Sequence, residues 1–156
     1  MKVPEDPMLV CTRYAFRLET LSSYAGGSTG ESFRRYQELG EAPRNTHWAA
    51  MVDSVRQRGC EVKRLRLISE PPSPYESFEI QVGYSAGLDA GEDIRLAPRA
   101  LLSSYFDFWA YDDEWIEELT YADDGDFITS VVRRVEAEDL KMIRHCMQVF
   151  DTSRQL

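Results

Sequence analysis

The chain of 156 residues has few of the residues around which enzyme and metal sites are built. It contains two histidines, His47 and His145, and three cysteines, Cys11, Cys60 and Cys146. An odd number of widely spaced cysteines forms neither a disulfide framework nor a zinc finger, so we expect reduced thiols that are mostly buried. No motif in the sequence pairs either histidine with a serine or cysteine nucleophile. It therefore assigns no catalytic residue, no metal and no cofactor.

Long apolar runs are also missing. No stretch approaches the roughly 20 residues that a membrane helix needs, and Met1–Pro7 lacks the basic and apolar regions of a signal peptide. The glycines of Ala25–Gly30 have neither the preceding strand nor the lysine of a phosphate-binding loop. These absences predict a cytoplasmic protein that does not contact membranes.

Positive charge is in short supply, with 18 basic against 27 acidic residues and a formal net charge of −9. A phosphate backbone would repel such a chain, so we expect no direct binding to nucleic acid. Bases lie close together over Arg56–Arg66, whereas Asp107–Asp126 contains acids and no base. The two segments form either opposed patches or the solvated faces of surface elements.

The length suits a single domain over residues 1–156, with residues 1–8 as a frayed lead. No state is assigned to Leu9–Leu21, whose apolar positions have no clean period. A capping box at Ser28 predicts a short helix that ends at Gly40. Its inward positions are Phe33, Tyr36 and Leu39.

A second helix is predicted from an N-cap at Thr46 to Gly59. The β-type run Cys60–Ile68 follows directly. It is expected to place Leu65, Leu67 and Ile68 in the core, while its arginines face outward or pair with the acidic segment.

A third helix is predicted to begin at Ser73, where a serine cap, a proline in the first turn and Glu76 complete a capping box. We expect this helix to run to Ala90-Gly91, although Phe78–Tyr84 alternates like a strand, which is the alternative. Asp93–Ala97 is predicted as the next strand. The order helix, strand, helix, strand then indicates a βαβ unit with a parallel pair.

The rest of the chain predicts an antiparallel meander and a closing helix. Asp107–Asp113 would form a strand turned at Asp112-Asp113, followed by strands over Trp115–Tyr121 and Phe127–Val135. A cleanly amphipathic helix follows over Ala137–Phe150. The fold class is therefore α/β, with the βαβ unit extended by the meander and with helices packed on the sheet.

Two sets of residues are candidates for a site. Ligands of open α/β sheets lie beyond the carboxyl ends of parallel strands, and that edge would carry Glu70, Ser73, Tyr75 and Arg99. We expect either a bound anion or acidic partner group there, or a plain Glu70–Arg99 salt bridge.

The second set comes from the meander and comprises Asp107, Trp109 and Asp112. Its crowded aromatic residues form either packing pairs or a binding surface. The aspartates of Asp112-Asp113 and of 123–126 lack the spacing of a calcium loop and are typical of hairpin turns.

The motifs Ser69–Tyr75, Gly91–Arg95 and Asp107–Asp113 resemble an actinobacterial domain-of-unknown-function family that is abundant in Streptomyces-type genomes. The likeness covers most of the chain, from about Phe16 onward. It implies a stand-alone cytoplasmic protein, often encoded near helix-turn-helix regulators. It transfers no catalytic residue.

The run Val62–Val135 is also similar in layout to one half of a phospholipase D-like domain, in which a strand, a helix and a strand precede a hairpin with Asp-Asp. Active members need a His-x-Lys motif. Here His47 is followed by Trp48-Ala49 and His145 by Cys146-Met147. The resemblance therefore implies a non-catalytic, effector-sensing version of that domain.

Taken together, the sequence predicts a non-enzymatic binding or regulatory module. Its ligand would be a small anion, or its partner a protein such as a transcriptional regulator. The alternative is an enzyme for phosphorylated or carbohydrate-like substrates. That enzyme would use Glu70, Asp107 or Asp112 as acid or base and Arg99 as the charge clamp.

Overall fold

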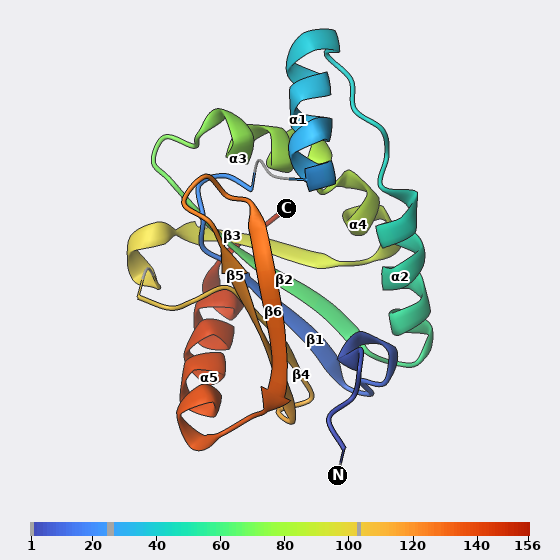
Figure 1. Ribbon diagram of the computed structural model, residues 1–156, viewed down its shortest axis with the longest axis vertical. Coiled ribbons are helices and arrows are strands. Elements are labelled where there is room, and N and C mark those ends of the chain that lie inside the picture. The colour runs from blue at the N-terminus through green and yellow to red at the C-terminus, as the bar shows by residue number, and fades with distance from the viewer. Residues whose placement is uncertain (1, 25–26, 103) are drawn as a thin grey trace.

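A computed structural model describes residues 2–24, 27–102 and 104–156, which form one mixed α/β domain (Figure 1). Its centre is a seven-stranded sheet in the order β6-β5-β4-β1-β2-β3-β7. The strands are β1 (Tyr14–Glu19), β2 (Glu61–Ile68), β3 (Asp93–Pro98), β4 (Phe108–Tyr111), β5 (Trp115–Tyr121), β6 (Phe127–Arg134) and β7 (Arg154–Gln155). The helical elements are η1 (Pro7–Leu9), α1 (Gly27–Leu39), α2 (Thr46–Gln57), α3 (Pro74–Phe78), η2 (Glu79–Gly83), α4 (Ser85–Ala90), η3 (Arg99–Leu101) and α5 (Ala137–Thr152).

Both faces of the sheet are covered by helices, as Figure 1 shows. The amphipathic α5 packs Ile143, Cys146 and Phe150 against Phe16 and Phe108 on one face. The other face carries α2, and beyond it the α3–α4 segment and α1. None of the helices in the described ranges is long and apolar enough to cross a membrane.

The central strand is β1, in the segment to which the sequence assigned no state. It pairs in parallel with β2 and antiparallel with β4. All of its residues are buried. Phe16 and Leu18 face α5, while Arg17 and Glu19 point to the opposite side. The side chains thus alternate as in any strand, but the charged ones are also covered.

The predicted βαβ unit is confirmed, because β2 and β3 are parallel neighbours. The connection between them is helical from Pro74 to Ala90, as predicted over the strand alternative. A π-helical turn, η2, interrupts it at Glu79–Gly83. Gly91, at φ +102°, ends it in a left-handed conformation that glycine adopts without strain.

The antiparallel meander and the closing helix are also confirmed. Three local predictions are wrong. The N-cap of α2 is Asn45 rather than Thr46, Leu39 is exposed on α1, and Ile68 is only partly buried. The capping interaction predicted for Ser28 lies outside the described side chains.

Residues 1–8 were predicted to be a frayed lead, but the chain already packs against the domain at Pro7 and Met8. Asp6 caps the short turn η1, and both Pro7 and Met8 are buried. Met8 contacts the cluster that holds Cys11 and Cys60 beneath α2. All three cysteines are buried free thiols, as predicted, but the Sγ atoms of Cys11 and Cys60 lie 3.6 Å apart despite their separation in sequence.

Asp112 fixes the start of β1. It lies in the β4–β5 turn at φ +57°, a conformation that aspartate tolerates better than most residues. Its carboxylate accepts hydrogen bonds from the backbone nitrogens of Thr12 (2.7 Å), Arg13 (2.7 Å) and Tyr14 (2.9 Å). Burial opposes the charge, but these three donors hold the pKa of Asp112 below its usual value. Asp112 is therefore a structural anchor.

We expect Asp112→Ala to lower the free energy of unfolding by about 3 kcal/mol, because it removes charge-assisted bonds to three backbone donors. Asp112→Asn keeps a short side chain that tolerates the turn and one accepting oxygen, so it should lose about half as much. Urea denaturation at pH 7 measures both. The wild-type advantage should be complete above the ordinary aspartate pKa and fade as the pH falls below it. Equal stability of all three proteins would contradict this assignment.

Candidate functional site

The carboxyl-terminal half of β1 and β2 carries charges on the face opposite α5. Arg17 and Glu19 extend from β1, and Arg64 and Arg66 from β2. The parallel register places Arg17 beside Arg64 and Glu19 beside Arg66. The prediction that the β2 arginines face outward or pair with the acidic meander is wrong, because the helical layer covers them and Arg66 is fully buried.

Each guanidinium is paired with carboxylates from other segments. Arg17 Nη2 lies 3.2 Å from Asp107. Arg64 binds Glu19 at 3.0 Å and Glu92 at 2.7 Å. Arg66 binds Glu79, in the π-helical turn, at 2.6 Å. Buried ions are tolerated only when paired and hydrogen-bonded in this way, so these pairs fix where the surrounding segments lie.

Asp107, one of the predicted site residues, lies at the edge of this network. Its carboxylate accepts hydrogen bonds from Arg17, from the hydroxyl of Tyr24, and from both the backbone nitrogen and the hydroxyl of Thr20. It is almost fully buried. With its oxygens already occupied, Asp107 positions Arg17 and Tyr24 instead of facing a ligand.

Aromatic rings enclose Arg64. Its guanidinium carbon lies 5.5 Å from the ring centres of Trp48 and Tyr84 and 5.6 Å from that of Trp109. Trp48 also donates its indole N–H to Glu92 at 2.9 Å.

That contact of Trp48 with Glu92 requires a glycine in α4. A Cβ at Gly87 would come within 2.2 Å of a Glu92 oxygen and 3.1 Å of the Trp48 nitrogen. Any larger residue at this position would displace the carboxylate from Arg64.

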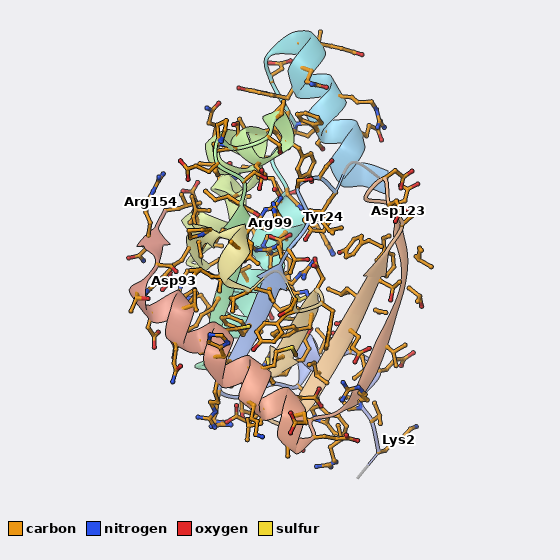
Figure 2. All side chains as sticks on the ribbon, turned by 90° about the vertical axis from the view of Figure 1, so that its left-hand side faces the viewer. Lys2, Tyr24, Asp93, Arg99, Asp123 and Arg154 are labelled. Carbon is orange, nitrogen blue, oxygen red and sulfur yellow. The ribbon has the colours of Figure 1, made fainter. Side chains whose placement is uncertain are left out.

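A cleft of about 420 Å³ lies over this charged network, at the carboxyl ends of β1 and β2. The helical layer forms one wall and the β5–β6 hairpin the other. Figure 2 shows Tyr24 at this end of the sheet and Asp123 at the tip of the hairpin. The residues that line the cleft are mostly aromatic or charged: Arg17, Glu19, Tyr24, Asn45, His47, Trp48, Arg64, Tyr75, Phe78, Glu79, Gly83, Tyr84, Glu92, Trp109, Tyr121, Gly125 and Phe127.

Glu19 and Glu79, which both line the cleft, have different pKa values because their surroundings differ. Burial alone would raise the pKa of Glu19, but the guanidiniums of Arg64, Arg17 and Arg66 lower it to about 2. Burial raises the pKa of Glu79 to about 7, with Arg66 opposing and Glu19 adding to the shift. Of the two carboxyl groups, Glu79 is therefore the weaker acid.

At the sheet edge where an anion or a Glu70–Arg99 salt bridge was predicted, Arg99 has a different partner. Glu70 is exposed, and Arg99 pairs with Glu76 at 2.7 Å. Glu76 also accepts the backbone N–H groups of Ser69 and Ser73, and Ser73 completes the predicted capping box. The chain's own carboxylate thus occupies the place where an anion was expected.

Of the seven predicted site residues, only Tyr75 and Trp109 line the cleft, and Asp107 lies beneath it. Asp112 is the β1 anchor, Ser73 and Arg99 contact Glu76, and Glu70 is exposed. Sequence reasoning missed the residues of the network itself. The signal was the alternation of charged with apolar residues in Arg17-Leu18-Glu19 and Arg64-Leu65-Arg66, within strands that helices cover on both faces.

The described residues contain no cluster of three or more histidine, cysteine or acidic side chains placed to hold a metal. Within the same ranges, one hydrogen bond involves a histidine ring: it joins His145, on the exposed side of α5, to the hydroxyl of Tyr105. His47 lies on the cleft, but no hydrogen bond in those ranges couples it to a serine, threonine or cysteine. Among the described residues, the arrangement offers carboxyl groups of different acidity and no histidine-coupled nucleophile.

Comparison with known proteins was informative at two levels. A family described as "Domain of unknown function (DUF6879)" matches residues 6–155. The chain belongs to this family. No curated protein matched it.

The DUF6879 chain is similar in structure to Nuc of Salmonella typhimurium, a phospholipase D family member. The TM-score is 0.56 at 8% sequence identity, over 96% of this chain and 86% of Nuc. At that identity the likeness shows a shared fold alone. The predicted similarity in layout to phospholipase D-like domains is thus supported at the level of fold.

We expect Arg66→Leu to lower the free energy of unfolding by about 3–5 kcal/mol, because it leaves Glu79 buried without its partner. The matched control is Arg44→Leu, which breaks an exposed pair of similar length, 2.8 Å to Asp89, and should cost less than about 1 kcal/mol. Chemical denaturation of the three proteins measures both changes. Similar costs at the two positions would show that the buried network does not hold the fold together.

Proposed function

We propose that this DUF6879 protein is a non-enzymatic binding module that takes a small molecule in the cleft over β1 and β2. One observation carries the proposal: the cleft has aromatic walls, and its charged base is already paired within the protein. Pockets for small ligands have volumes of roughly 300–1,000 Å³ and combine apolar walls with a few polar groups. The cleft, at about 420 Å³, fits that description.

Its place in the fold supports the same proposal. Ligands of open α/β sheets bind beyond the carboxyl ends of the strands, and the cleft lies at that end of β1 and β2. Segments far apart in sequence meet there, since Trp48 comes from α2, Tyr75 from α3 and Trp109 from β4. A pocket built from several elements is positioned by the whole fold.

A second candidate is an enzyme that uses carboxylates for acid–base chemistry. It is favoured by Glu19 and Glu79, whose pKa values of about 2 and about 7 lie far apart in one cleft. Two carboxyl groups of different acidity in one cleft are the groups that such catalysis needs.

The other functional expectations remain proposals. A helix-turn-helix partner and an actinobacterial origin rest on the resemblance of the Gly91–Arg95 and Asp107–Asp113 motifs. A cytoplasmic location and the lack of nucleic-acid binding rest on composition and net charge. The small anion proposed at Arg99 would have to displace Glu76.

The binding proposal is tested by thermal-shift screening of a metabolite library against the wild type and Gly83→Leu. Gly83 lies on the cleft, and a Cβ there makes only ordinary contacts, the nearest at 3.4 Å to Phe78. A leucine should therefore fold normally and obstruct the cleft. Compounds that stabilise the wild type should fail to stabilise this variant.

Gln81→Leu is the control, because it adds the same side chain in the same π-helical turn but away from the cleft. It should respond to ligands like the wild type. Ligands that stabilise Gly83→Leu equally, or a library without any stabilising compound, would contradict the proposal. Recovery of bound compounds chemically unchanged separates binding from turnover, and conversion lost in Glu79→Gln would favour the enzyme.

Despite the shared fold with Nuc, we expect no phosphodiesterase activity. Neither histidine belongs to a His-x-Lys motif, and His47 and His145 lie on different elements, α2 and α5. Incubation with bis(4-nitrophenyl) phosphate should release nitrophenolate no faster than buffer does. Turnover that disappears in His47→Ala or His145→Ala would overturn this expectation.

A further inference from the structure

The base of the cleft holds more negative than positive groups. Three guanidiniums face four carboxylates there: Arg17, Arg64 and Arg66 against Glu19, Glu79, Glu92 and Asp107. All seven are mostly or fully buried, so solvent screens the imbalance poorly. An added anion would meet four carboxylates that already hold the guanidiniums. A cation would bring the cluster to neutrality.

Tyr75 supplies an unused polar group. Its side chain is only 2% exposed and lines the cleft, yet its hydroxyl has no hydrogen-bond partner among the described residues. Burial, followed by the nearby charges of Glu79 and Glu19, raises its pKa well above the usual value. The hydroxyl is thus held neutral beside the carboxylates. An unsatisfied buried hydroxyl costs free energy, and a ligand group that bonds to it recovers that cost.

The walls of the cleft suit a positive charge. Tyr24, Trp48, Trp109 and Tyr121 present aromatic rings to it, and aromatic faces attract organic cations through their quadrupole. The chain itself uses this interaction there, since Arg64 lies against Trp48 and Trp109.

We propose that the ligand of the cleft is a small organic cation, with Glu79 as its counter-ion and the Tyr75 hydroxyl as its hydrogen-bond partner. This inference rests on the proposed binding function and names the ligand's chemical class. It differs from the anion expected from the sequence, which was assigned to Arg99.

A pH dependence follows from Glu79, whose pKa is raised to about 7 in the free protein. A cation binds the ionised carboxylate, so affinity should rise about tenfold from pH 6 to pH 8 as Glu79 loses its proton. Other titratable or charged groups act on Glu79 from the neighbouring elements: Arg66 of β2, Glu19 of β1, Tyr75 of α3 and Tyr84 before α4. His47 also lines the cleft.

The test compares benzylamine, benzyl alcohol and benzoate, which share one ring and differ in charge, by calorimetric titration of the whole protein. Benzylamine should bind about tenfold more tightly than either of the others. Tyr75→Phe removes a hydroxyl without a protein partner, so it should keep wild-type stability and weaken benzylamine binding about fivefold. Glu79→Gln should abolish the rise between pH 6 and pH 8, whereas His47→Gln should keep it.

Three results would overturn the inference. Preferred binding of benzoate or benzyl alcohol would show that the cleft is not a cation site, while leaving the proposed binding function intact. Binding of none of the three, with library compounds still stabilising the wild type but not Gly83→Leu, would do the same. Glu79→Gln also changes the ion pair with Arg66, so Tyr75→Phe is the deciding variant. If Tyr75→Phe does not weaken benzylamine binding, the proposal is wrong.

Discussion

The structure depends on neutralising three guanidiniums in the middle of a sheet. The parallel register sets Arg17 of β1 directly beside Arg64 of β2, a like-charge pair that would be destabilising without compensation. The compensating carboxylates come from outside these two strand positions. Asp107 precedes β4, Glu92 precedes β3, and Glu79 lies in the helical connection. Charge compensation thus ties the meander, the βαβ crossover and the central strands into one unit.

This requirement explains local features that propensity does not. The π-helical turn places Glu79 against Arg66 in a connection whose sequence alternates like a strand. Gly87 weakens its helix, yet its missing side chain lets Glu92 reach both Arg64 and Trp48.

Much of the architecture followed from local pattern, whereas the site did not. Capping at Ser73, the parallel pair β2–β3, the meander and α5 all have signals within a few residues of themselves. β1 had no such signal over Leu9–Leu21, because the short alternation of Arg17-Leu18-Glu19 lies in a segment whose apolar positions have no clean period. Whether an arginine in a strand faces water or a buried carboxylate depends on which distant segment covers it. That information lies in the tertiary fold.

The anion predicted at Arg99 was misplaced for the same reason, because the partner of Arg99 also depends on the tertiary fold. The parallel strands and the capped helix were placed correctly, and the edge attracts a carboxylate as expected. The carboxylate is that of Glu76, three residues into the capping box, where one side chain closes the helix start and neutralises the arginine. Sequence reasoning identified Glu70 as the carboxylate that could pair with Arg99, but Glu70 is exposed.

The position of the tryptophans gives the cleft an optical property. Of the three in the chain, Trp48 and Trp109 line the cleft with ring centres 5.8 Å apart, and Trp115 lies buried beneath α2. Two indoles at that distance, tilted by 51° to one another, couple their electronic transitions. Near-ultraviolet circular dichroism and intrinsic emission therefore carry a strong contribution from the cleft itself. Its occupancy can be followed without any attached label.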